Sequence, residues 1–79
     1  MPIEAYILVK LRAAPLENIT ERFKKFEEIV ECSMVTGEID IIIKAVVKET
    51  KDLFELVKKI RDVPEVLSTM TSIVISKCK

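Results

Sequence analysis

The 79-residue chain has no histidine, no tryptophan and only one glycine, Gly37. Without histidine, catalysis by a histidine base and metal binding through imidazole are both excluded. The two cysteines, Cys32 and Cys78, are far apart and form no C-x-x-C pair. This spacing indicates two ordinary reduced residues rather than a disulfide scaffold or a thiolate metal site. We therefore expect no metal and no cofactor.

An excess of charge of one sign is also missing, because 13 basic residues balance 13 acidic ones. A protein that binds nucleic acid directly needs a basic face to neutralise phosphates, so no direct nucleic-acid partner is expected. No apolar run reaches the ~18 residues that span a bilayer, and the N-terminus lacks the basic-then-apolar pattern of a signal peptide. We therefore expect a cytoplasmic protein without a membrane partner.

Apolar residues are abundant, at 49% of the chain. A chain of this length forms one domain, residues 1–79, and buries only about 60–65% of the surface of its unfolded state. As a monomer, such a domain would leave part of its apolar surface exposed. Self-association is the simplest way to cover that surface, because obligate interfaces resemble a hydrophobic core.

The first part of the chain predicts a strand and a helix. Ile3–Leu11 alternates imperfectly and is apolar on both faces, which is typical of a strand buried on both. A helical pattern then opens at Pro15. Its apolar residues follow at steps of four, three and four positions and form one helical stripe: Ile19, Phe23, Phe26 and Val30.

Two strand-like segments, residues 30–36 and 39–47, meet at Gly37. A glycine takes positive φ cheaply, as a tight hairpin or a bulge requires. Three consecutive isoleucines in the second segment again indicate burial on both faces.

A second helix is expected to begin near Thr50 or Asp52, either of which can cap it, and to end at Pro64. Basic residues occupy its last turn, where the helix dipole favours cations. Residues 66–76, rich in Thr, Ser, Ile and Val, predict the last strand.

This order of elements, β-α-β-β-α-β, predicts a ferredoxin-like α+β fold. Right-handed crossovers place both helices on one face of a four-stranded antiparallel sheet. The opposite face would carry Tyr6, Leu8 and Ile42 and would be larger than the apolar patch that a soluble monomer usually exposes. We expect it to be a dimer interface, sheet against sheet, as in a dimeric α+β barrel; a monomer with a tolerated patch is the alternative.

One polar group stands out at the predicted rim of the sheet, because Asp40 follows Gly37 by three residues and can contact a small ligand there. In the last strand, Thr69, Thr71 and Ser72 place three hydroxyls close together. If that strand ends near the Gly37 hairpin, the hydroxyls and Asp40 would converge on one small polar pocket. The hydroxyls are equally consistent with simple β propensity, and Asp40 with a bond to the backbone of its own hairpin.

The remaining polar groups do not predict catalysis. The carboxylates of Glu27, Glu28 and Glu31 lie at the end of an exposed helical face, which indicates surface charge rather than an acid–base pair. Tyr6, the only tyrosine, is more typical of an interface aromatic than of a catalytic acid.

Several segments, taken in order, resemble one known family. The segment Thr36–Asp40 has the sequence Thr-Gly-Glu-Ile-Asp, and a long apolar strand and a helix follow it. Val63–Val66 then contains a Pro-Glu-Val element, and residues 69–74 have the sequence Thr-Met-Thr-Ser-Ile-Val. Together these segments resemble the effector-binding (RAM) domain of the Lrp/AsnC transcription regulators over essentially the whole chain.

The resemblance implies a βαββαβ dimer with its sheets face to face, assembly of dimers into larger rings such as octamers, and amino-acid effectors bound between dimers. Full-length members carry a helix-turn-helix before this domain, so the chain is similar to the stand-alone members. The ligand contacts of the family carry over to six positions of this sequence: Thr36, Gly37, Asp40, Thr71, Ser72 and Ile73. The sequence departs from the family at Ile39, where an aromatic is frequent, at Glu65, where glycine is usual, and at Glu27, where proline is frequent.

We therefore expect a stand-alone module that binds an amino acid, oligomerises and modulates transcription or amino-acid metabolism, with full-length Lrp/AsnC relatives as candidate partners. One alternative is a small dimeric α+β barrel enzyme, such as a monooxygenase. Such enzymes usually depend on His, Trp or Asn, and Asn18 is the only asparagine here, so we expect no enzyme. The other alternative is a structural assembly module without a ligand.

Overall fold

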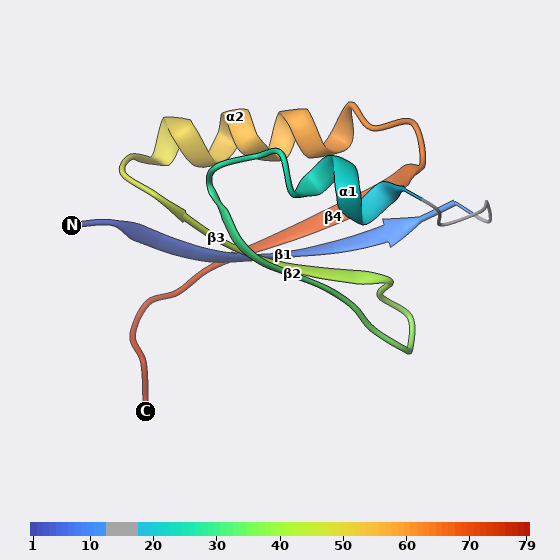
Figure 1. Cartoon of the computed structure of the whole chain (residues 1–79). Coiled ribbons are helices and arrows are strands. Elements are labelled where there is room, and N and C mark those ends of the chain that lie inside the picture. Colours follow the sequence, from blue (N-terminus) through green and yellow to red (C-terminus); the bar gives the residue numbers. More distant parts are fainter. Residues whose placement is uncertain (13–17) are drawn as a thin grey trace.

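The computed structural model describes residues 1–12 and 18–79. Its elements follow the order β-α-β-β-α-β (Figure 1). The described strands and helices are β1 (Ile3–Leu11), α1 (Ile19–Phe23), β2 (Ile29–Met34), β3 (Ile41–Val47), α2 (Thr50–Arg61) and β4 (Val66–Ile73).

The four strands form one antiparallel sheet in the order β2-β3-β1-β4. Both helices lie on the same face of this sheet, and the other face is open (Figure 1). These findings confirm the predicted ferredoxin-like α+β fold.

The core lies between the sheet and the helices. In β1, the alternate residues Ala5, Ile7 and Val9 are completely buried against the helices. In β3, Ile41 and Ile43 are also completely buried, because the strand period of two sends them to that same face. Helix α2 covers them with one apolar stripe, and its fully buried members are Leu53, Leu56 and Ile60.

The N-cap of helix α2 lies one residue before the predicted cap Thr50 and three residues before the other, Asp52. This N-cap is Glu49, and the Asp52 side chain accepts a hydrogen bond from the Glu49 backbone N–H at 3.2 Å. Asp52 therefore supports the first turn from position N3, as in a capping box. The basic last turn is present as expected, with Lys58, Lys59 and Arg61. In the described part of the chain, neither helix has the length and apolar character needed to cross a membrane.

Helix α1 is much shorter than predicted. Ile19 and Phe23 are buried as the stripe required, but Phe26 follows the helix in a turn and Val30 lies in β2 with 54% of its surface exposed. The helical pattern fails here because residues 28–30 join the sheet: the Glu28 carbonyl accepts a hydrogen bond from the Val46 N–H. The predicted start at Pro15 lies outside the described residues.

Two strands, β2 and β4, end earlier than predicted, and β3 begins two residues later. The chain leaves β2 after Met34, and β3 begins at Ile41, so the connection around Gly37 is a six-residue loop rather than a tight hairpin. β4 ends at Ile73, although the Val74 N–H still donates to the Glu4 carbonyl at 2.8 Å.

The open face is less apolar than predicted. Tyr6 is 40% exposed there, Leu8 and Ile42 are half-buried, and Met70 is 63% exposed. Charged residues alternate with them, since Glu4 and Lys10 flank the apolar pair on β1 and Lys44 lies opposite Tyr6 on β3. This face is a mixed surface with an apolar centre.

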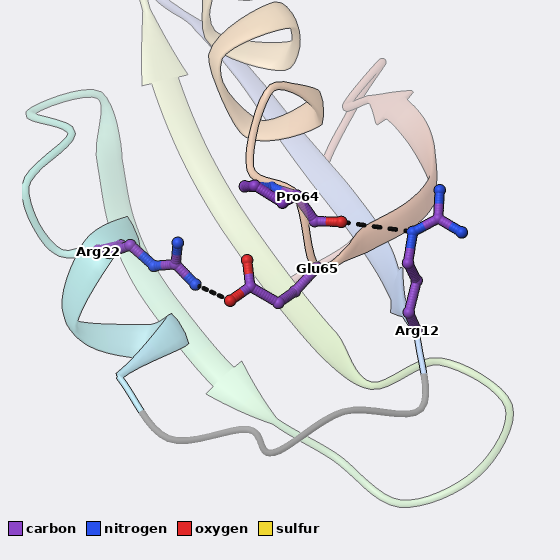
Figure 2. Close-up of polar contacts among 4 residues, drawn as sticks. All are labelled: Arg12, Arg22, Pro64 and Glu65. Atoms are coloured by element: carbon purple, nitrogen blue, oxygen red, sulfur yellow. Dashed lines mark hydrogen bonds and ion pairs between the residues drawn. The ribbon is translucent and has the colours of Figure 1, made fainter.

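An ion pair connects α1 to the turn that precedes β4 (Figure 2). Arg22 donates to Glu65 Oε2 at 2.5 Å, and Arg12 bonds the same turn through the carbonyl oxygens of Pro64 and Glu65. The hydrogen bond from Arg22 lowers the pKa of the Glu65 carboxyl below its ordinary value. Glu65 therefore holds the short helix α1 against the sheet.

We predict that Glu65→Gln lowers the melting temperature by a few degrees at most near neutral pH, because the pair is partly exposed to solvent. A carboxyl whose folded pKa is lowered stabilises the fold above the unfolded pKa, about 4.3 for Glu, and loses that contribution as pH falls through the folded value. Thermal melts from pH 7 to pH 2 should therefore show the difference between variant and wild type shrinking on acidification.

Glu21→Gln is the matched control, since Glu21 pairs with Lys24 on an exposed surface of the same helix. It should change the melting temperature less than Glu65→Gln does. A difference between Glu65→Gln and wild type that stays constant down to pH 2 would contradict the ionic role of Glu65.

Candidate functional site

The loop between β2 and β3 contains Gly37 in a backbone conformation that favours glycine. Its φ is +110°, and a Cβ atom built there would meet nothing within 4 Å. The glycine is therefore required by the backbone conformation and not by a lack of space. Thr36 and Gly37 are both exposed, so this loop is open to solvent.

Asp40 connects the start of β3 to the end of β1. Its side-chain Oδ2 accepts a hydrogen bond from the Leu11 N–H at 2.7 Å, and its own N–H donates to the Val9 carbonyl at 3.0 Å. Its carbonyl accepts from the Val35 N–H at 2.9 Å and so closes the loop. One oxygen of the Asp40 carboxylate therefore has a structural role. Asp40 does bond the backbone, as the alternative prediction proposed, but its partner is in β1 and not in its own hairpin.

The predicted contacts of the last strand lie toward its end. Thr71 is paired with Ile7, Ser72 with Tyr6 and Ile73 with Ala5. Because facing residues of antiparallel strands share a side of the sheet, Ser72 points to the open face and Thr71 and Ile73 to the helix face. All three are exposed.

Within one chain, these two groups of residues do not form one pocket. Asp40 bonds residues at the end of β1, namely Val9 and Leu11, whereas Ser72 and Ile73 pair near the start of that strand. β4 begins opposite Leu11, at the end of β1 where Asp40 bonds, and Thr71, Ser72 and Ile73 lie farther along it, opposite the first half of β1. The predicted convergence required β4 to end near the Gly37 loop. Because β4 instead ends near the start of β1, the prediction of one pocket within a single chain is wrong.

A hollow that sequence reasoning missed lies between the open face and the chain after β4. Its volume is about 490 Å³, and its polar lining groups are Tyr6, Lys44, Ser72, Ser76, Lys77 and Lys79. The chain after β4 leaves the sheet on the side away from the helices (Figure 1).

Glu4 stands beside the hollow and pairs with two of its lysines. Its carboxylate oxygens lie 3.0 Å from Lys77 Nζ and 3.5 Å from Lys44 Nζ. The hydrogen bond from Lys77, together with the charges of both lysines, lowers the pKa of Glu4. The only sequence signal was the position of Glu4 and Tyr6 on the same side of β1, and Lys77 carried no signal at all.

The other reactive groups give no second site. Cys32 is half-buried in β2, where burial raises the pKa of its thiol and keeps it protonated at neutral pH. Cys78 is exposed near the end of the chain. Across residues 1–12 and 18–79, no group of three Cys, Asp or Glu side chains is placed to hold a metal ion.

Comparison with known proteins places this fold in a family. The family described as the Lrp/AsnC ligand binding domain matches residues 4–79. The crystal structure of FFRP-DM1 is 34% identical with a TM-score of 0.85, and the match covers 92% of this chain and 99% of that one.

Two curated relatives from archaea show this domain in larger proteins. The HTH-type transcriptional regulator FL11 of Pyrococcus horikoshii is 33% identical over 75 residues, which are 95% of this chain and 50% of the regulator. Homocitrate synthase of Sulfurisphaera tokodaii is 33% identical over 76 residues, 95% of this chain and 16% of that protein. The chain thus spans about half the length of the regulator and a small part of the synthase. With the family matched over residues 4–79, the chain belongs to the Lrp/AsnC ligand-binding (RAM) domain family.

Proposed function

We propose that residues 1–79 act as a single domain that binds an amino-acid effector, oligomerises and thereby modulates transcription or amino-acid metabolism in the cytoplasm. The family supports the ligand-binding role. The similarity to part of a transcriptional regulator supports a role in transcription, and the similarity to part of homocitrate synthase supports a role in amino-acid metabolism. The domain acts without catalysing a reaction, and its balanced charge disfavours direct binding to DNA.

The observation that carries the proposal is the separation of the candidate contacts. Gly37 and Asp40 lie at one end of the sheet, and Thr71, Ser72 and Ile73 lie toward the other. An effector that contacts both groups must therefore sit between copies of the chain, with one group from each. Binding and assembly are then coupled, because the effector stabilises the contact that forms its site.

The chemistry of the two groups suits a free amino acid. Asp40 uses one oxygen for the Leu11 N–H, and a carboxylate has further acceptor positions that can bind an ammonium group. The effector's carboxylate needs donors, which the backbone around Gly37 and the hydroxyl of either Thr71 or Ser72 supply, since these two hydroxyls point to opposite sides of β4. A charge-assisted hydrogen bond of this kind contributes about 1.5–3 kcal/mol.

The open face of the sheet is proposed to form the dimer. Leu8 lies at its centre between Ile42 on β3 and Met70 on β4. These side chains, with Tyr6, offer an apolar centre surrounded by charge, as in many protein interfaces. Further assembly of dimers, up to an octamer, would then bring the two groups of effector contacts together.

We predict that Asp40→Asn weakens binding of the responsive amino acid by about 2 kcal/mol, roughly thirty-fold, and leaves the free protein folded. The asparagine keeps an oxygen that can accept from the Leu11 N–H, but it removes the charge that the ammonium needs. Asp40→Ala removes both and should also lower the melting temperature without ligand. An amino-acid panel in a thermal-shift assay measures both effects.

The two variants separate the possible roles of Asp40. If Asp40→Asn binds as tightly as wild type and only Asp40→Ala is unstable, Asp40 is purely structural and the site assignment is wrong. If no amino acid shifts the melting temperature of wild-type protein, the ligand-free assembly module replaces the proposal.

We predict that Leu8→Glu weakens the dimer by roughly thirty-fold or more, because it places an unpaired charge at the centre of the buried face. Sedimentation equilibrium over a concentration series measures the change. Phe54→Glu is the matched control, since Phe54 is 67% exposed on α2, on the other side of the sheet. Equal effects of the two variants, or a wild-type chain that stays monomeric at all concentrations, would contradict the proposed interface.

A further inference from the structure

We propose that helix α1 is coupled to Asp40 through the end of β1, so that an effector bound at Asp40 controls how firmly α1 is held against the sheet. The inference deepens the proposed function, on which it rests for the effector. It names the element of the domain that responds when the effector site is filled.

The coupling begins at Leu11, just beyond the ladder of β1 and β3. That ladder ends where Val9 pairs with Ile41, so β3 supplies no paired residue opposite Leu11. The Leu11 N–H donates instead to Asp40 Oδ2 at 2.7 Å, and a side chain takes the place of a backbone partner. Any movement of the Asp40 carboxylate toward an effector therefore acts on the end of β1.

Arg12 continues the connection toward β4. Its backbone N–H donates to the Glu65 carbonyl at 2.8 Å, and its Nε donates to the Pro64 carbonyl at 3.3 Å (Figure 2). Successive N–H groups of a strand point to opposite sides, so Leu11 is tied to Asp40 and Arg12 to the turn before β4. A planar peptide bond joins these two residues, and a rotation at one is transmitted to the other.

The side chain of Glu65 completes the path to α1. Its Oε2 accepts from Arg22, which lies in the middle of that helix (Figure 2). α1 has only five residues, Ile19–Phe23, and its N-cap Asn18 makes no side-chain cap bond. So short a helix is marginal by itself and depends on its tertiary contacts. The ion pair with Glu65 is therefore a contact through which the hold on α1 can change.

The ion pair also leaves room for a second arrangement of nearly equal free energy. Among the described residues, Glu65 Oε1 is buried without a hydrogen-bond partner. A buried acceptor without a partner costs free energy, so the observed arrangement is not an optimal one. A ligand that favours one of two such arrangements shifts their populations by its difference in affinity.

The first test needs no effector. Asp40→Ala removes the acceptor of the Leu11 N–H. We expect the Arg22 and Lys24 amides, which bond within α1, to exchange with deuterated solvent roughly threefold faster or more. The amides of α2 are the internal reference, because a global loss of stability would accelerate both helices.

Glu65→Ala determines whether the ion pair carries the effect. It removes the partner of Arg22 but keeps the backbone carbonyl that bonds Arg12. In this background, Asp40→Ala should cause little further acceleration in α1, because the connection is already broken. Glu21→Ala is the matched control, since Glu21 pairs with Lys24 on an exposed surface of the same helix. In the control background, Asp40→Ala should keep its full effect.

The second test adds each standard amino acid in turn to the wild-type chain. An amino acid that raises the melting temperature should also slow amide exchange in α1. Because coupling between two sites is reciprocal, Glu65→Ala should weaken binding of that amino acid by about fivefold. Glu21→Ala should leave its binding unchanged.

Equal acceleration of α1 and α2 in Asp40→Ala, or a full effect of Asp40→Ala in the Glu65→Ala background, would overturn the coupling. An amino acid that binds without changing exchange in α1 would overturn the regulation and leave the proposed function intact. If no amino acid binds, the proposed function and its regulation both fail, while exchange in Asp40→Ala still shows whether Asp40 and α1 are connected.

Discussion

The rest of the structure depends on the pairing of β1 with two strands at once. β1 is central, with β3 on one side and β4 on the other, and its helix-facing residues Ala5, Ile7 and Val9 are completely buried. Its opposite residues form the middle of the open face. Because side chains alternate strictly along a strand, a slip of one position would exchange the two faces and destroy core and interface together.

The same strand positions the candidate site and the hollow. At its end, the Leu11 N–H binds the Asp40 side chain and so fixes the carboxylate beside the loop that carries Gly37. At its start, Glu4 binds Lys44 and Lys77 and so shapes the hollow below the last segment. Asp40 therefore serves stability and, in our proposal, recognition, and the two roles use different parts of one carboxylate.

The fold could be predicted from the sequence because local patterns and strand pairing agree over most of the chain. α1 is the exception: spacing continues the helical stripe to Val30, but Ile29 pairs with Ala45 and draws that segment into the sheet. Contacts between segments far apart in the sequence could not be predicted either, because they form only when the sheet is assembled. Examples are the ion pairs of Glu4 with Lys77 and of Arg22 with Glu65. The sequence also did not reveal that Thr71 and Ser72 lie toward the start of β1, away from Asp40, whereas Thr69 pairs with Val9, because strand direction depends on the assembled sheet.

The central claim, an effector site shared between copies, is tested most directly by mixing two defective variants. Asp40→Asn removes one group of contacts, and Thr71→Val combined with Ser72→Ala removes the other. When the two proteins are refolded together in equal amounts, random assembly should restore about one quarter of the amino-acid sites. Each restored site combines the intact group of contacts from one variant with the intact group from the other. Calorimetric titration that finds no tight sites in the mixture, although each variant assembles, would contradict the account.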